Sequence, residues 1–150
     1  MSTKDINNTR SALDMLPALG EALDGGIFAG ITTTKEGVHV AVVLLPSRGE
    51  DLNWQAAQEW AKDAGGELPS RPVAALLFAN AKKHLPGGWH WTSEPDGASW
   101  AWYCDFSHGD QSDDLRSAEL SAVAVRRIPC VFRPAAQDGS KLGNDGQQRP

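Results

Sequence analysis

The sequence predicts a single α+β domain in which two helices are inserted between antiparallel strands. Three observations lead to this prediction. A chain of 150 residues has the ordinary size of one domain. Several short segments alternate apolar and polar residues, as half-buried strands do, and two central segments instead carry apolar residues at helical spacing. The domain is expected over residues 27–133, after an N-terminal helical arm over residues 1–26 and before a disordered tail over residues 134–150.

The arm is expected to be helical because four leucines recur at helical spacing between residues 10 and 24, ahead of Gly25-Gly26. These are Leu13, Leu16, Leu19 and Leu23. Their side chains would bury against the domain or against a second subunit, so a homo-oligomer formed through the arm is one expectation. The tail has almost no apolar residues to bury and is therefore expected to be disordered.

The first two strands are expected over Ile27–Thr34 and Val38–Leu45, joined by a turn at Lys35-Glu36-Gly37. The second of these strands is apolar on both faces, so it should be buried on both sides. A polar turn is expected to follow over residues 46–51.

Two helices are expected next. Asn53 is placed to cap the first, which should end at Gly65-Gly66. Ser70 should cap the second, which has Pro72 in its first turn and should end near His84. The buried face of the first helix is expected to carry Trp54, Ala57, Ala61 and Ala64.

The remainder of the domain is expected to be β-structure. A short strand over Trp89–Thr92 should end in a turn at Glu94-Pro95-Asp96-Gly97, and a polar loop over residues 111–119 should precede a last strand over Ser121–Ile128. Between the turn at 94–97 and this polar loop, the residues from 100 to 106 alternate strictly, which places every second side chain on a single buried face. That set is Trp100, Trp102, Cys104 and Phe106.

Composition excludes several classes of function. The chain has 14 Lys+Arg against 19 Asp+Glu, a net charge of −5, so no nucleic-acid partner is expected. No apolar stretch is long enough to span a membrane and no secretion signal is found, so the expected location is the host-cell cytoplasm or a virion. Histidines and cysteines lack metal-ligand spacing, so no metal or other cofactor is expected.

Five short motifs connect the chain to a known family. They are Asn53-Trp54-Gln55-Ala56-Ala57, Glu67-Leu68-Pro69-Ser70, Trp89-His90-Trp91-Thr92-Ser93-Glu94, the segment from Trp100 to Gly109, and Val123-Ala124-Val125-Arg126-Arg127. In this order, over about two thirds of the chain, they resemble the Lcl C-terminal domain family of bacteria and phages. The resemblance implies a C-type-lectin-like fold and a phage or prophage origin. It also implies kinship in fold with formylglycine-generating enzymes and retroelement variable proteins. The family's Trp-Arg pair before Leu-Pro is replaced here by Gly66-Glu67.

Two chemical interpretations were weighed against simpler ones. Glu94-Pro95-Asp96 is similar to the tripeptide with which calcium-dependent lectins hold a sugar, but the next strand offers only Asp105 as a further ligand, so a plain turn is favoured. Catalysis of the formylglycine-generating kind would need two thiolates. Cys104 is expected in the core, and a disulfide to Cys130 stays open. No nucleophile–base motif is present.

The sequence therefore predicts a non-enzymatic binding module that recognises a protein or a glycan. The alternative is a virion structural or assembly protein that uses the fold as a building block. Segments Trp89–Ser99 and Ser107–Glu119 are expected to face the ligand, and their carboxylates would suit a basic or hydroxyl-rich partner. The candidate ligand-binding residues are His90, Glu94, Asp96, His108, Asp110, Asp113 and Asp114.

Overall fold

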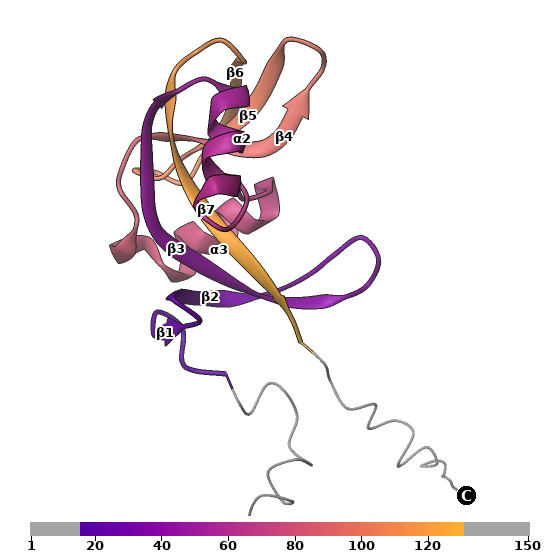
Figure 1. The fold of residues 1–150 in the computed structure, drawn as a ribbon, viewed down its shortest axis with the longest axis vertical. Coiled ribbons are helices and arrows are strands. Elements are labelled where there is room, and N and C mark those ends of the chain that lie inside the picture. The colour runs from indigo at the N-terminus through magenta and orange to yellow at the C-terminus, as the bar shows by residue number, and fades with distance from the viewer. Residues whose placement is uncertain (1–15, 131–150) are drawn as a thin grey trace, which may run out of the picture. The chain divides into compact units, whose positions relative to one another are not determined.

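The computed structural model describes residues 16–130, and the unit Pro17–Pro129 is considered by itself. The disordered tail expected over 134–150 and the first 15 residues of the expected arm lie outside the described residues. The elements follow one another as β1 (Ala22–Leu23), β2 (Gly26–Thr33), β3 (His39–Leu52), α2 (Trp54–Asp63), α3 (Arg71–Asn80), the 3₁₀ turn η2 (Lys82–His84), β4 (Trp89–Asp96), β5 (Trp100–Asp105), β6 (Gln111–Leu115) and β7 (Leu120–Pro129) (Figure 1).

The described strands form one mixed sheet of seven, in the order β1-β2-β3-β7-β4-β5-β6, so the predicted α+β class is confirmed. Neighbouring strands are antiparallel except β4 and β7, which are parallel and meet at His90 and Ser121. The last strand thus lies in the middle of the sheet and joins the β1–β3 half to the β4–β6 half. Within the described part of the chain, no helix is both long and apolar enough to cross a membrane.

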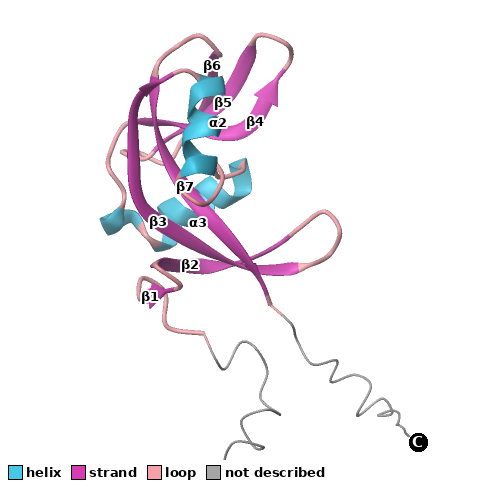
Figure 2. Cartoon of the chain, viewed as in Figure 1, coloured by secondary structure: helices cyan, strands magenta, loops and turns pink. Residues whose placement is uncertain are grey.

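The two helices cover opposite faces of the central strands. Val42 and Leu44 of β3 pack in one cluster with Leu77 of α3, whereas Val43 and Leu45 belong to a second cluster. That second cluster contains Trp54, Ala57 and Ala61 of α2, which Figure 2 shows lying along β3 and β7. The sequence prediction that this strand is buried on both sides is confirmed, since every residue from 40 to 45 is buried.

Both predicted helix caps are confirmed. The Asn53 side chain accepts a hydrogen bond from the Ala56 N–H, and the Ser70 side chain accepts one from the Val73 N–H. Helix α3 ends earlier than expected, at Asn80, and the chain continues through the short η2 turn.

The N-terminal helix predicted over residues 10–24 is wrong in its described part. Residues 22 and 23 form strand β1, which pairs with β2. The turn between them is Asp24-Gly25, with φ of 48° and 83°. An Asp-Gly pair with both φ angles positive makes a tight hairpin whose twist matches its strands. Pro17 and the left-handed Gly20 also oppose a helix here.

Three segments predicted as turns or loops are strands instead. The expected turn at 46–51 is the outer half of β3, which continues to Leu52 through register shifts. The first three residues of the expected turn at 94–97 belong to β4 and the turn itself begins at Gly97, while the expected loop at 111–119 contains β6. The composition of these segments is polar, and they are strands because a neighbouring strand supplies their backbone partners.

The core can be tested at Trp91, which is fully buried and donates its indole N–H to the Leu52 carbonyl at 2.8 Å. We expect Trp91→Ala to lower the free energy of unfolding by about 3–5 kcal/mol, because it leaves a large cavity. Trp100→Ala, at a side chain that is 43% exposed, should cost less than about 1 kcal/mol. Urea unfolding of both variants provides the measurement, and similar losses would contradict the assigned faces.

Candidate functional site

The candidate site is the outer part of the sheet on the α3 side. Strand β5 pairs Trp100 with Asp96 of β4 and with Leu115 of β6, and it pairs Trp102 with Asp113 of β6. Cross-strand partners project from the same face of a sheet. We call the surface formed by Asp96, Trp100, Trp102, Asp113 and Leu115 the aromatic-acidic face.

The inner edge of this face is fixed by Arg71, the first residue of α3. Its guanidinium carbon lies 3.6 Å from the centroid of the Trp102 ring. Its Nε donates to the Gln111 side chain at 2.8 Å, and the Gln111 amide donates back to the Arg71 carbonyl at 2.9 Å. The Arg71 backbone N–H donates to a Glu94 carboxylate oxygen at 2.8 Å. Arg71, which covers the Trp102 ring, is therefore tied to β4 and β6.

The start of α3 also decides which tryptophans are buried. Trp102 was expected in the core, but it is only partly buried, because the helix begins at Arg71 and covers it with a side chain alone. Beyond that point, Trp100 is 43% exposed and its neighbour Leu115 is 44% exposed. The predicted alternation of β5 is correct for Cys104, which is fully buried on the α3 side.

Two carboxyl groups meet on the aromatic-acidic face. The hydrogen bond between the carboxyls of Asp96 and Asp113 raises the pKa of Asp96, and partial desolvation and the Asp113 charge act in the same direction. The charge of Arg71 opposes them more weakly. None of the three ion pairs formed among residues 16–130 involves either carboxyl group.

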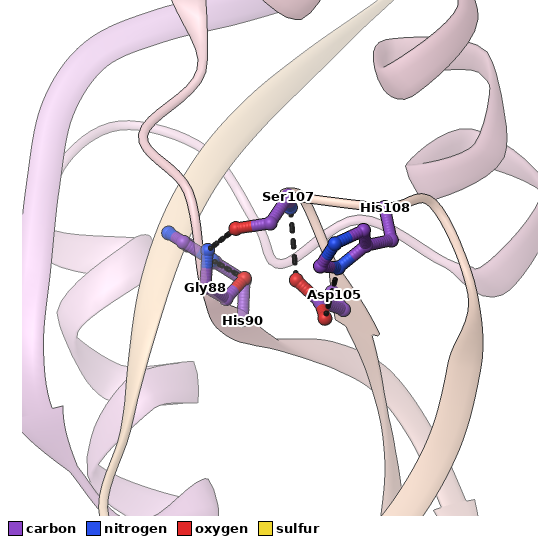
Figure 3. A network of polar contacts seen from close by, with 5 residues as sticks. All are labelled: Gly88, His90, Asp105, Ser107 and His108. Carbon is purple, nitrogen blue, oxygen red and sulfur yellow. Dashed lines mark hydrogen bonds and ion pairs between the residues drawn. The ribbon is translucent and has the colours of Figure 1, made fainter.

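The predicted residues His108 and Asp110 lie in a different place, at the turn after β5. Their potential ligand atoms and those of Asp105 lie within 4.8 Å of one another. Asp105 accepts the Ser107 N–H at 2.8 Å, which is the main cause of its lowered pKa, and its other oxygen lies 3.3 Å from His108 Nδ1 (Figure 3). These contacts explain the Asp105 and His108 side chains as parts of a turn held by its own hydrogen bonds, and Asp110 joins the turn through its carbonyl, which accepts the Asp105 N–H at 2.8 Å.

His90, which was predicted to contact a ligand, is buried in the structure. The ring is 1% exposed, lies 4.9 Å from the Phe106 ring centroid, and donates from Nδ1 to the Gly88 carbonyl (Figure 3). Burial lowers the pKa of His90, helped by the Arg48 charge and opposed by the Gly88 hydrogen bond and Asp105. Its Nε2 is buried and meets no hydrogen-bond partner among the described residues. His90 is thus a neutral packing residue.

Asp114 also lies away from the aromatic-acidic face. It is paired with Ala101, so its side chain projects from the opposite side of β6, and it accepts the Leu115 N–H at 2.7 Å. Of the seven predicted residues, the structure therefore brings Glu94, Asp96 and Asp113 together around Arg71. Sequence reasoning missed Arg71, Trp100 and Leu115 as site residues. The strand pairing that joins them spans three separate segments and leaves no local signal.

The surroundings of Cys104 keep its thiol buried and protonated. Its side chain is fully buried and carries a free thiol. Burial, with smaller contributions from the Asp105 and Asp110 charges, raises the pKa of the thiol to about 11. The thiol is therefore protonated at neutral pH, where thiol chemistry requires the thiolate.

A hollow of about 540 Å³ lies elsewhere in the described part of the chain. It is lined by Val38 and Val40 of the β2–β3 hairpin and by Arg127 of β7, which pairs with Glu67 at its rim. None of the seven predicted site residues lines it. Its lining residue Arg126 forms an ion pair with Asp24, which lies outside the hollow.

The buried state of His90 predicts a specific pH dependence of stability. The pKa of His90 in the folded state lies below the ordinary value of 6.5. As the pH falls, His90 is therefore protonated in the unfolded chain before it is protonated in the folded chain. The free energy of unfolding should be highest above that value and should fall as the pH drops through it. His90→Gln should remove this part of the slope, which for one proton is at most about 1.4 kcal/mol per pH unit. Urea unfolding between about pH 7.5 and pH 5.5 measures it, and equal slopes in both proteins would contradict the assignment.

The state of Cys104 predicts low reactivity. The experiment uses a Cys130→Ser variant, in which Cys104 is the one remaining thiol. The pKa of Cys104 is about 11 in the folded protein against an ordinary 9.0, so the folded protein holds roughly a hundredfold less thiolate than the unfolded chain. Labelling by Ellman's reagent should therefore be at least that much slower in buffer than in urea. Cys104→Ser serves as the blank, and similar rates in both conditions would place the thiol at the surface.

Comparison with known proteins adds no identity to this site. No model of a known protein family matches the chain, and no curated protein matches it. The function is therefore argued from the geometry of the aromatic-acidic face.

Proposed function

We propose that the chain is a non-enzymatic binding module of C-type-lectin-like fold that recognises its partner through the aromatic-acidic face. The observation that carries this proposal is the cross-strand pair of Trp100 and Leu115, which are 43% and 44% exposed on a sheet face that α3 leaves uncovered. Exposed aromatic and aliphatic side chains that adjoin each other mark interaction surfaces. Burial of a tryptophan supplies much of the energy of a typical interface.

The rigidity of the face supports a binding role. Trp102 is held under Arg71, and Arg71 is tied in turn to Gln111 and Glu94. A surface whose side chains are already ordered loses little conformational entropy when a partner docks. The face is therefore organised for recognition before a partner arrives.

The fold itself is supported by the structural use of the shared motifs. Trp54 donates its indole N–H to the Thr92 carbonyl at 2.9 Å, and Trp91 donates to the Leu52 carbonyl. Leu68 is buried in the same cluster. These residues join α2, β3 and β4, so the motif residues that resemble the lectin-like family are those that hold the halves of the sheet together.

The positions of the chemically reactive side chains favour binding over catalysis. Cys104 and His90 are buried in the core, and the Asp105 carboxylate serves the turn that contains His108. Catalytic groups need access to a substrate and mutual geometry suited to proton or electron-pair transfer. These side chains instead stabilise the scaffold.

The test is to use the full chain as bait on a glycan array and in a bacterial lysate, in parallel with Trp100→Ala and Trp89→Ala. Trp89 is a matched control because it is 47% exposed but lies on the other face, stacked on Tyr103 at 4.5 Å. We expect Trp100→Ala to weaken capture of the partner by about tenfold or more, and Trp89→Ala to leave it unchanged.

Circular dichroism of both variants verifies the fold. Capture that is insensitive to Trp100→Ala would refute the assigned face, and the absence of any specific partner would refute the binding role. The assembly alternative predicts that the partner is a second copy of the chain. Light scattering would then show a concentration-dependent mass that Trp100→Ala reduces.

A further inference from the structure

We propose that the aromatic-acidic face recognises an arginine or lysine side chain of a protein partner, held between the Asp96–Asp113 carboxyls and the Trp100 ring. This inference rests on the proposed function and specifies the chemistry of its partner. The arguments come from the carboxyl pair, from the occupied neighbouring ring, and from the distribution of charge around the face.

The carboxyl pair brings two acidic groups from separate strands together on the face, and the charge of Arg71 acts on Asp96. Asp96 is on β4 and Asp113 is on β6, so the two groups reach across β5 to hydrogen-bond each other. The hydrogen bond to Asp113 is the main cause of the raised pKa of Asp96, and desolvation and the Asp113 charge add to it. A cation placed beside the pair would be attracted to both carboxyl groups. A neutral glycan would supply hydrogen bonds but would not offset the charge.

The protein already carries a cation on the adjacent ring of the same strand. The Arg71 guanidinium lies over the Trp102 ring at 3.6 Å, and its Nε donates a hydrogen bond to the Gln111 side chain. These two contacts hold the guanidinium at the Trp102 ring. Trp100 presents the next ring on the same face of β5, and no cation of the described residues stacks on it. An incoming guanidinium or ammonium group would repeat at Trp100 the contact that Arg71 makes at Trp102.

The remaining charges around the face favour a basic partner. Arg116 lies beside the same turn, where its Nε donates to the Trp100 carbonyl at 3.1 Å and its guanidinium stacks over the Trp54 ring, so this cation is already engaged and does not stack on the Trp100 ring. The Glu94 carboxylate lies beside Arg71, and the whole chain has a net charge of −5. The field at this end of the sheet therefore attracts cations and repels acidic surfaces.

The experiment titrates the full chain with Nα-acetyl-arginine amide and Nα-acetyl-lysine amide, while NMR follows the indole N–H resonance of Trp100. Nα-acetyl-citrulline amide is the neutral control, and methyl α-mannoside and N-acetylglucosamine are the sugar probes. We expect the two cationic probes to shift the Trp100 resonance. The citrulline probe should bind with an affinity at least about tenfold lower than theirs. Binding should weaken as the salt concentration rises from about 50 to about 300 mM.

Matched variants locate the cation. Asp113→Asn and Asp114→Asn change the net charge equally on neighbouring residues of β6, but only Asp113 projects onto the face. We expect Asp113→Asn to reduce probe affinity about tenfold, a loss of about 1.4 kcal/mol, and Asp114→Asn to leave it unchanged. The amide spectrum verifies that each variant is folded, and the salt dependence of the unmodified chain tests the inference without any variant.

Equal binding of the arginine and citrulline probes, or equal effects of the two substitutions, would overturn the inference. A Trp100 shift caused by the sugar probes alone would assign the face to a glycan and would also overturn it. If a captured partner depends on Trp100 but not on Asp96 and Asp113, the proposed function stands and the cationic specificity fails. If it depends on neither, the proposed function fails as well.

Discussion

The alternation of strand β3 between two cores is the constraint on which the rest of the structure depends. Val42 and Leu44 face α3, while Val43 and Leu45 face α2. Because each helix covers one face, both helices must pack against this strand for both faces to be buried. A one-residue slip would exchange these two sets of side chains. Strand β7 repeats the pattern, with Val123 and Val125 toward α3 and Ala122 and Ala124 toward α2.

The position of α3 on this frame determines where the sheet is left open. The Ser70 cap and the Glu94 carboxylate both bind N–H groups at the start of the helix, which fixes its first turn against β4. Residues of β5 that lie beneath the helix are buried, as Cys104 is, and those beyond its start are not, as Trp100 shows. One helix terminus therefore decides which aromatic rings stabilise the fold and which remain available to a partner.

The polar residues of the β4–β6 half divide in the same way between structure and surface. His90 is buried beside Phe106, and Asp105 holds the turn at Ser107 and His108, so these groups stabilise the connection between β4 and β5. Asp96 and Asp113 take part in none of the three ion pairs formed among residues 16–130, and they hydrogen-bond each other where the Arg71 charge acts on Asp96. Carboxyl groups whose pKa is raised by a close neighbour, as that of Asp96 is, are found at binding sites.

The sequence by itself determined the features that depend on residues a few positions apart. The caps at Asn53 and Ser70, the buried stripe of α2 and the two apolar faces of residues 40–45 all follow from local spacing. Only the tertiary structure decided that the polar segment Gln111–Leu115 is a strand, since its backbone groups are paired by β5. It also decided that Trp100 is exposed and His90 is buried. Alternation assigns a side chain to a face of a sheet, but whether that face is covered depends on where a helix distant in sequence begins.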